Sequence, residues 1–154
     1  MADMDLFGWP DASGLVRVVI RLGSAAILGG LIGLERERAG KAAGTRTHMM
    51  VALGAALFVL VPTLAGLEPG DLSRVIQGIA AGIGFLGGGT IIKRSSESDI
   101  EGLTSAATIW FTGAIGIAAG AGQIWLALVG VASAWAVLSI ALRLDRWVSA
   151  RRRG

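Results

Sequence analysis

Side chains able to do chemistry gather in two short polar segments that separate apolar runs. A helix that begins in either segment would expose unpaired N–H groups, next to Arg46 in one case and Lys93 in the other. Thr45 and Thr104 are the predicted caps of these two helices. The pattern predicts a surface that attracts an anion or an acidic partner, and a set of interfacial ion pairs with helix caps is the alternative. The segments are Glu35-Arg36-Glu37-Arg38 with Gly44-Thr45-Arg46-Thr47-His48, and Lys93-Arg94 with Glu101-Gly102-Leu103-Thr104-Ser105.

Metal binding and catalysis find little support in these segments. His48 is the only histidine and the chain has no cysteine, which excludes multi-histidine sites, cysteine–zinc sites, iron–sulfur ligation and thiol catalysis. Magnesium prefers carboxylates and retained waters, but Glu35 and Glu37 alternate with arginines. Ser105 and His48 are the one candidate nucleophile–base pair, and neither following apolar run carries a carboxylate to orient the imidazole. The sequence predicts no enzyme, no metal site and no cofactor.

The composition indicates a membrane protein. Of 154 residues, 53% are hydrophobic and 16% are charged, and the mean hydropathy is +0.67. Soluble domains carry roughly 25% charged residues. The chain therefore has too few charges to cover a water-soluble globule of this size.

Five apolar runs have the length of membrane-spanning helices. At 1.5 Å per residue each run reaches about 27–30 Å, close to the ~30 Å hydrocarbon thickness of a bilayer. The first run contains Arg17 and Arg21 in its first two turns, where long stems reach the headgroups. A signal peptide is the alternative there, but Asp3, Asp5 and Asp11 precede the run with no Lys or Arg. The predicted spans are 15–34, 49–66, 75–92, 103–121 and 124–142.

The basic residues predict the orientation of this all-α, polytopic helical bundle. With five spans, eleven Lys and Arg residues fall on one side and only Arg74 on the other, apart from the two inside the first span. Because basic loops stay in the cytoplasm, the N-terminus is predicted outside and the C-terminus inside. The domains are an external segment 1–14, a five-span domain 15–142 and a basic tail 143–154. A nucleic-acid arm is the alternative for the tail, but Trp147 favours an anchor on anionic lipid.

A shift of 58 residues aligns the first predicted hairpin with the second. Leu28-Gly29-Gly30 falls on Leu86-Gly87-Gly88, and Gly44 falls on Gly102. Because the first and third spans run in the same direction, the alignment predicts a parallel repeat of two helical hairpins.

Glycines at helical spacing are the predicted contacts between spans, because small residues let helix backbones approach closely in lipid. Packing within the chain and a seam with another helix remain open alternatives. The Gly87–Gly89 run leaves a third interpretation open, in which the third span breaks and turns its carbonyls toward an ion. The predicted packing positions are Gly23, Gly30, Gly33, Gly78, Gly82, Gly84, Gly88, Gly113 and Gly116.

Four sequence blocks resemble the MgtC/SapB family of bacterial inner-membrane proteins, and the resemblance runs from about residue 22 to 142. The blocks are Leu31–Glu37, Gly44–His48, Gly82–Gly88 and Gly102–Trp110. The resemblance implies that the family's characteristic positions here are Glu35, Arg36, Arg46, Thr47, Lys93, Thr104 and Trp110. Together with His48 and Ser105 they form the predicted ligand or partner surface.

The resemblance also implies a function. Family members are associated with growth or virulence under magnesium limitation, and some restrain the F-type ATP synthase. Many continue into a soluble cytoplasmic domain, so regulation through that domain is in question for a chain ending at Gly154.

Two functions remain open for this sequence. The first is a non-enzymatic membrane regulator that contacts the bilayer and either itself, as a homo-oligomer, or another integral membrane complex, with no nucleic-acid partner. The second is a transporter or channel for Mg²⁺ or a small solute. For either function we expect Arg21 to reach the outer interface or to pair with Glu68 or Asp71.

Overall fold

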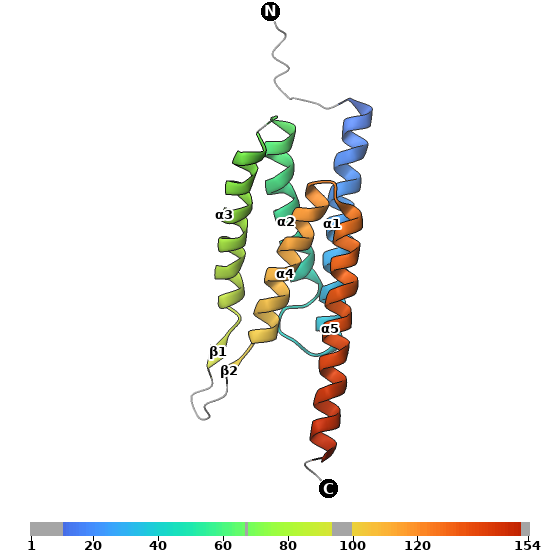
Figure 1. Ribbon diagram of the computed structural model, residues 1–154, viewed down its shortest axis with the longest axis vertical. Helices are drawn as coiled ribbons and strands as arrows, with labels where there is room; N and C mark the ends of the chain where they lie inside the picture. The colour runs from blue at the N-terminus through green and yellow to red at the C-terminus, as the bar shows by residue number, and fades with distance from the viewer. Residues whose placement is uncertain (1–10, 67, 94–99, 152–154) are drawn as a thin grey trace, which may run out of the picture.

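The computed structural model of the chain describes residues 11–66, 68–93 and 100–151, and these form a bundle of five helices (Figure 1). The helices are α1 (Ala12–Arg38), α2 (Thr45–Leu64), α3 (Pro69–Gly88), α4 (Leu103–Gly120) and α5 (Ile124–Arg151). Two short antiparallel strands, β1 (Ile92–Lys93) and β2 (Ile100–Glu101), join α3 to α4. The predicted all-α helical bundle is confirmed.

Three of the helices are long and apolar enough to cross a membrane: α1, α2 and α4. The apolar part of α5, Ile124–Ile140, is slightly shorter. Helix α3 carries Asp71 and Arg74 in its first two turns. The assignment of α3 and α5 as the fourth and fifth spans stays a prediction.

Helix ends follow from local chemistry. Asp11 caps α1, because its carboxylate accepts a hydrogen bond from the Gly14 N–H at 2.9 Å. The Ser13 hydroxyl also donates to this carboxylate, and these two bonds hold the pKa of Asp11 below its usual value. Between α4 and α5 the chain turns at Gly122, whose φ of 83° suits a residue without a Cβ atom.

The bounds of α3 differ from the predicted span 75–92. The helix begins at Pro69, because proline is well suited to the first position of a helix. It ends at Gly88, where the carbonyls of Gly87 and Gly88 accept hydrogen bonds from the N–H groups of Thr90 and Ile91. The Gly87–Gly89 run therefore ends the helix four residues before the predicted end of the span, and the interpretation in which its carbonyls turn toward an ion stays a prediction.

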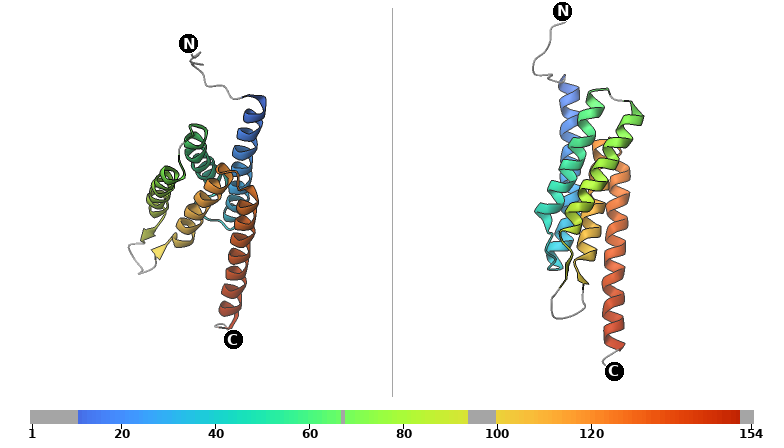
Figure 2. Two further views of the ribbon diagram at one scale, coloured as in Figure 1. Left: turned by 45° about the horizontal axis from the view of Figure 1, so that its top comes forward. Right: turned by 90° about the vertical axis from the view of Figure 1, so that its left-hand side faces the viewer.

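Helix α4 is the centre of the bundle. It contacts each of the other four helices, and α3 lies at the edge against α2 and α4 (Figures 1 and 2). We call the lower end in Figure 1 the basic end: there α1 and α5 end and α2 and α4 begin. The other end, where α1 begins and α2 joins α3, is the far end. The α4–α5 turn lies well short of it (Figure 1).

Close backbone approach holds α4 against α2. A Cβ atom on Gly116 would lie 2.8 Å from the Ala52 Cα atom, and one on Gly120 would lie 2.6 Å from the Ala56 carbonyl oxygen. Neither position has room for a side chain. Around this contact lies an apolar core of Ala25, Leu28, Ile32, Ala52, Ala56, Ile115, Ala119, Ala127 and Val131.

The predicted packing glycines fall into two groups. Gly33, Gly113 and Gly116 lie where a Cβ atom would collide with a neighbouring helix or the loop before it, and Gly30 lies against the Met49 side chain. Five others face open space, with no neighbouring heavy atom within 4 Å of the Cβ position: Gly23, Gly78, Gly82, Gly84 and Gly88. A contact role for this second group stays a prediction and requires a partner outside the described chain.

The two hairpins share a contact at the predicted 58-residue offset. A Cβ atom on Gly29 would lie 2.7 Å from the His48 carbonyl oxygen, and one on Gly87 would lie 3.1 Å from that of Ala106. Helices α2 and α4 also begin 58 residues apart. These correspondences agree with a repeated helical hairpin.

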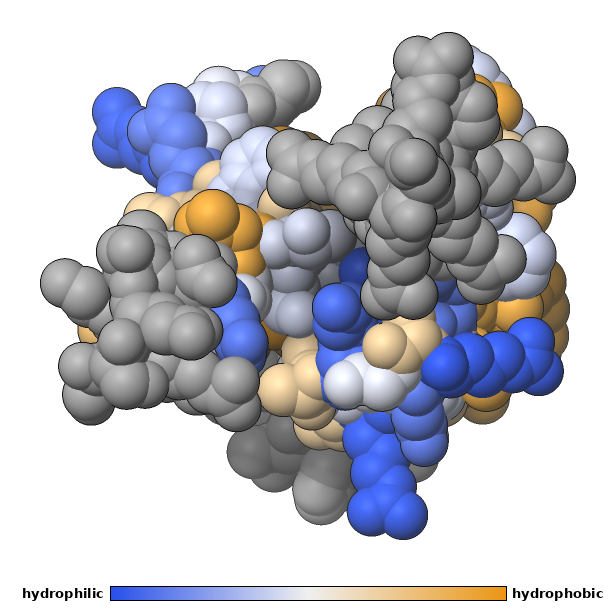
Figure 3. Space-filling view, turned by 90° about the horizontal axis from the view of Figure 1, so that it is seen from below, coloured by the Kyte–Doolittle hydropathy of each residue, from blue (hydrophilic) through white to orange (hydrophobic). Residues whose placement is uncertain are grey.

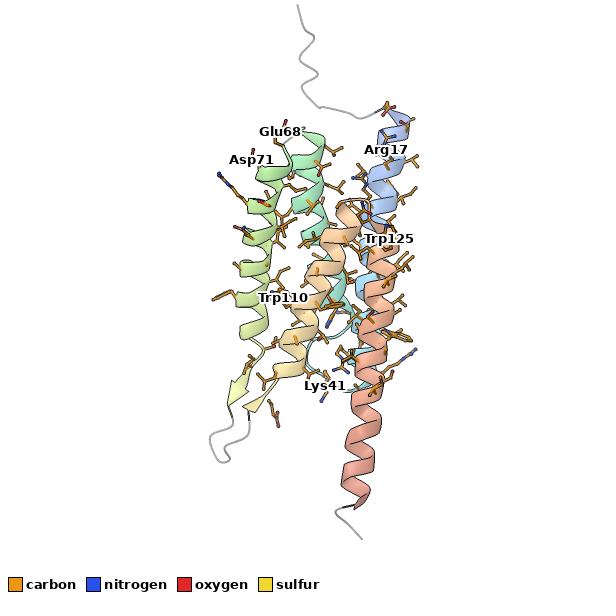
Figure 4. The ribbon with its side chains drawn as sticks, viewed as in Figure 1. Arg17, Lys41, Glu68, Asp71, Trp110 and Trp125 are labelled. Carbon is orange, nitrogen blue, oxygen red and sulfur yellow. The ribbon has the colours of Figure 1, made fainter. Side chains whose placement is uncertain are left out.

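Arg21 bonds to a helix end rather than to a carboxylate. Its Nη1 atom donates to the Gly120 carbonyl oxygen at 3.1 Å, at the negative end of the α4 dipole. Glu68 and Asp71 lie nearer the far end, around the start of α3 (Figure 4). The expected pairing of Arg21 with either carboxylate is wrong, because α4 ends short of the far end and presents its carbonyls first.

Candidate functional site

A buried polar core lies near the basic end of the bundle. It consists of all the buried polar side chains among the described residues: Arg36, His48, Ser105, Thr108 and Thr112. They come from the last turn of α1, the first turn of α2 and the first three turns of α4. Figure 3 views this end, where hydrophilic residues dominate the described surface. Polar groups from three helices therefore meet at one end of an otherwise apolar bundle.

Arg36 is the buried charge of this core. Its side chain is 3% exposed, and the adjacent Glu35 is 20% exposed. The Arg36 Nε and Nη2 atoms donate to the two Glu35 carboxylate oxygens at 2.5 and 2.9 Å. Two parallel bonds of this kind offset part of the cost of removing a guanidinium from water.

His48 is fully buried, and only one of its two ring nitrogens has a hydrogen-bond partner among the described residues. Its Nδ1 atom lies 2.9 Å from the Gly44 carbonyl oxygen, so Nδ1 carries the hydrogen and donates it. Its Nε2 atom is then an acceptor, and it has no hydrogen-bond partner among the described residues. Gly33 of α1 makes room for this side chain, because a Cβ atom there would lie 2.9 Å from the His48 Cβ atom.

The hydroxyls of α4 add further acceptors. Thr108 donates to the Ser105 carbonyl oxygen at 3.0 Å, and Thr112 donates to the Thr108 carbonyl oxygen at 2.8 Å. Their oxygens keep lone pairs free. Because Ala52 and Ala56 of α2 lie beside Gly116 and Gly120, the register puts His48 level with Thr112. The core can therefore accept hydrogen bonds, from a buried water for example.

The nucleophile–base pair suggested by the sequence is not formed. The described hydrogen bond of the His48 ring runs to Gly44 and not to Ser105. The part of the chain that the structure describes also contains no group of three His, Cys, Asp or Glu residues able to hold a metal.

The predicted threonine caps are wrong. The cap positions of α2 and α4 are Gly44 and Gly102, and neither helix has a side-chain cap bond to its cap residue. The Glu37 carboxylate instead accepts the Thr45 N–H at 3.0 Å. Sequence reasoning missed this role of Glu37, because the loop that brings Glu37 next to Thr45 is not readable from the residues alone.

The remaining predicted residues are spread over the molecule. Arg46 and Thr47 line a surface cleft of about 610 Å³ at the basic end, beside Glu37 and Lys41. Thr104 is exposed at the start of α4, and Lys93 belongs to β1. Trp110 lies farther along α4 and is 49% exposed, away from the level of Lys41 (Figure 4). The structure therefore places Arg46, Thr47, Thr104 and Lys93 at the basic end but on different elements, and Trp110 farther along α4.

Sequence comparisons place the chain among known proteins. It is 46% identical over 140 residues to Protein SrpB of Synechococcus elongatus, covering 82% of this chain and 75% of that protein. It is 40% identical over 132 residues to the Putative magnesium transporter YhiD of Escherichia coli K12, covering 79% and 59%. It is 47% identical over 105 residues to Protein MgtC of Brucella abortus, covering 67% and 42%.

The chain therefore spans about three fifths of the length of YhiD and less than half of that of MgtC. No solved structure matches it. The sequence profile of the MgtC family matches residues 22–147, a range that includes the buried core and the complete helices α2, α3 and α4. The chain belongs to the MgtC family.

Proposed function

We propose that this chain is an integral protein of the bacterial inner (cytoplasmic) membrane that serves adaptation to low magnesium without catalysis. It acts by contact of its helices with a second copy or with another membrane complex, such as the F-type ATP synthase. The names of its relatives YhiD and MgtC support the link to magnesium. Its helices α1, α2 and α4 support residence in a bilayer.

The main observation in favour of a non-transporting role is that the core is polar near one end of the bundle and apolar toward the other. Polar side chains are buried only near the basic end of the described bundle, whereas Ala25, Ala56 and Ala119 fill the core toward the far end. An ion path needs polar groups or water along its full depth. A polar pocket closed by an apolar layer suits a protein that senses or docks at one face.

A transporter is the second candidate. The printed name of YhiD favours it, as does the free acceptor on His48. Transport would require the apolar layer to open.

Flux measurements separate the two candidates. We expect sealed liposomes that contain the purified chain to show no magnesium or proton flux above that of empty vesicles. A flux that is abolished by Glu35→Gln or Lys93→Ala would contradict the proposed role. In parallel, the chain should restore growth at low magnesium to a strain that lacks its own family member, and Ser105→Ala should restore it equally well. A loss of activity in Ser105→Ala would favour an intramembrane enzyme.

Cysteine labelling tests the proposed orientation, since the chain has no native cysteine. We expect Ser13→Cys and Gly70→Cys to react with an impermeant maleimide from outside the cell. Ala42→Cys and Ser96→Cys should react only after the membrane is opened; Ser96 lies outside the described residues. Labelling of Ser13→Cys and Ala42→Cys from the same side would refute an odd number of spans.

A further inference from the structure

One face of α3 has no partner in the described chain. Six of its residues recur every three and four positions, which is the spacing of the a and d positions of a coiled coil. All six are exposed, although α3 packs against α2 and α4 on its other side. They are Asp71, Arg74, Gly78, Ala81, Phe85 and Gly88, and we call them the α3 seam.

The shape of the seam is complementary to itself. The Phe85 side chain is 88% exposed, the largest fraction among the exposed large hydrophobic residues. In a parallel pair of helices, a side chain at an a position enters a hole formed by four residues of the facing helix. For Phe85 that hole would consist of Ala81, Gly84, Phe85 and Gly88 of the partner subunit. Gly84 and Gly88 have no neighbouring atom within 4 Å of the Cβ position, so the hole is open.

The seam carries one negative and one positive charge where α3 begins. Asp71 and Arg74 are both exposed there, one turn apart in the first two turns of the helix. A membrane fixes the same orientation for every copy of a chain, so two α3 helices that meet side by side run parallel. A twofold axis then places Asp71 beside both Asp71 and Arg74 of the partner subunit, so that each Arg74 offsets the repulsion between the two carboxylates.

The position of α3 leaves the seam accessible. The helix lies at the edge of the bundle in Figure 1 and in front of the other helices in the right-hand view of Figure 2. Close approach of two α3 backbones is favoured in lipid by small residues, which Gly78, Ala81 and Gly88 supply. A twofold contact uses the same patch on both copies, as the seam requires.

We propose that two copies of the chain associate through their α3 seams in a parallel, twofold dimer. The proposal rests on the proposed function, which requires helix contact, and it names the copy and the helix that make this contact.

Disulfide crosslinking tests the interface in native membranes. We expect Gly78→Cys, Ala81→Cys and Gly88→Cys to form oxidised dimers about fivefold faster than Ser73→Cys, because a disulfide needs Cβ atoms about 4 Å apart. Ser73 is the matched control, since it is exposed on α3 but lies off the seam and outside the holes that receive its side chains. Equal crosslinking at the seam and control positions would overturn the proposal.

Substitutions in the hole and in the charges give a second test, read with Gly78→Cys as the reporter. Gly84→Phe fills the hole and should lower crosslinking about tenfold, whereas Ser73→Phe, outside every hole of the seam, should leave it unchanged. Asp71→Arg should lower crosslinking, and the double variant Asp71→Arg/Arg74→Asp should restore it. Undiminished crosslinking in Gly84→Phe would refute the seam.

Growth at low magnesium separates this proposal from the proposed function. If crosslinking follows the seam but Gly84→Phe restores growth as well as the unaltered chain, the dimer stands and is not the contact that supports growth. If the chain restores growth while seam and control positions crosslink equally, the function stands and the α3 dimer falls.

Discussion

Replacement of Gly116 by leucine is expected to lower the free energy of unfolding of the bundle by about 3 kcal/mol, since overpacking a filled core costs on this scale. A Cβ atom at this position would lie 2.8 Å from the Ala52 Cα atom, which belongs to backbone and cannot rotate away. Because α4 touches four other helices, it cannot shift away from α2 without disturbing those contacts as well. Unfolding of the purified chain in mixed micelles, followed by circular dichroism, measures the change.

Gly23→Leu is the matched control for this variant. Gly23 also lies within a helix, but its Cβ position has no neighbouring atom within 4 Å. The free energy of unfolding of this variant should stay within about 0.5 kcal/mol of that of the unaltered chain. Equal destabilisation by the two leucines would mean that the α2–α4 contact has room for a side chain at Gly116.

Replacement of Glu35 by glutamine is expected to destabilise the bundle by about 3 kcal/mol, because it leaves a buried guanidinium without its counter-charge. Arg36 is 3% exposed and both of its described side-chain bonds go to Glu35. Glu35 itself is 20% exposed, which places the effect at the lower end of the range for buried pairs. The same unfolding assay measures it.

The double variant Glu35→Gln/Arg36→Met distinguishes a lost ion pair from a lost side chain. Removal of both charges leaves no buried charge unpaired, so we expect the double variant to recover most of the stability lost in Glu35→Gln. If the two substitutions instead add their costs, Arg36 is stabilised by groups other than Glu35, and the polar core must be larger than its described members.

The existence of the five helices was predictable from sequence because apolar length alone decides it. The residues that cap α2 and α4 were harder to predict. The sequence pointed to Thr45 and Thr104, whereas glycines hold both cap positions. The carboxylate of Glu37, from α1, accepts the first N–H of α2 instead. The partner of Arg21 was missed for a similar reason. Which carbonyl it meets depends on where α4 ends, and that depends on packing.

The sequence predicted which residues belong to the candidate site but not that some of them are buried. The sequence singled out His48 and Arg36, yet only the packing of α1 against α2 buries them. Gly29 was not among the predicted contacts, although a Cβ atom there would lie 2.7 Å from the Ala52 Cβ atom. Helical spacing identifies a stripe of small residues, but the direction in which the stripe points is set by the whole bundle.

The central place of α4 links two regions that look unrelated. Thr112 belongs to the polar core, and the next residue, Gly113, lies directly against Ile83 of α3. A rotation of α4 about its axis would therefore change both the surroundings of His48 and the position of α3. We therefore expect a group bound beside His48 to influence the contacts that α3 makes, because α4 touches both places.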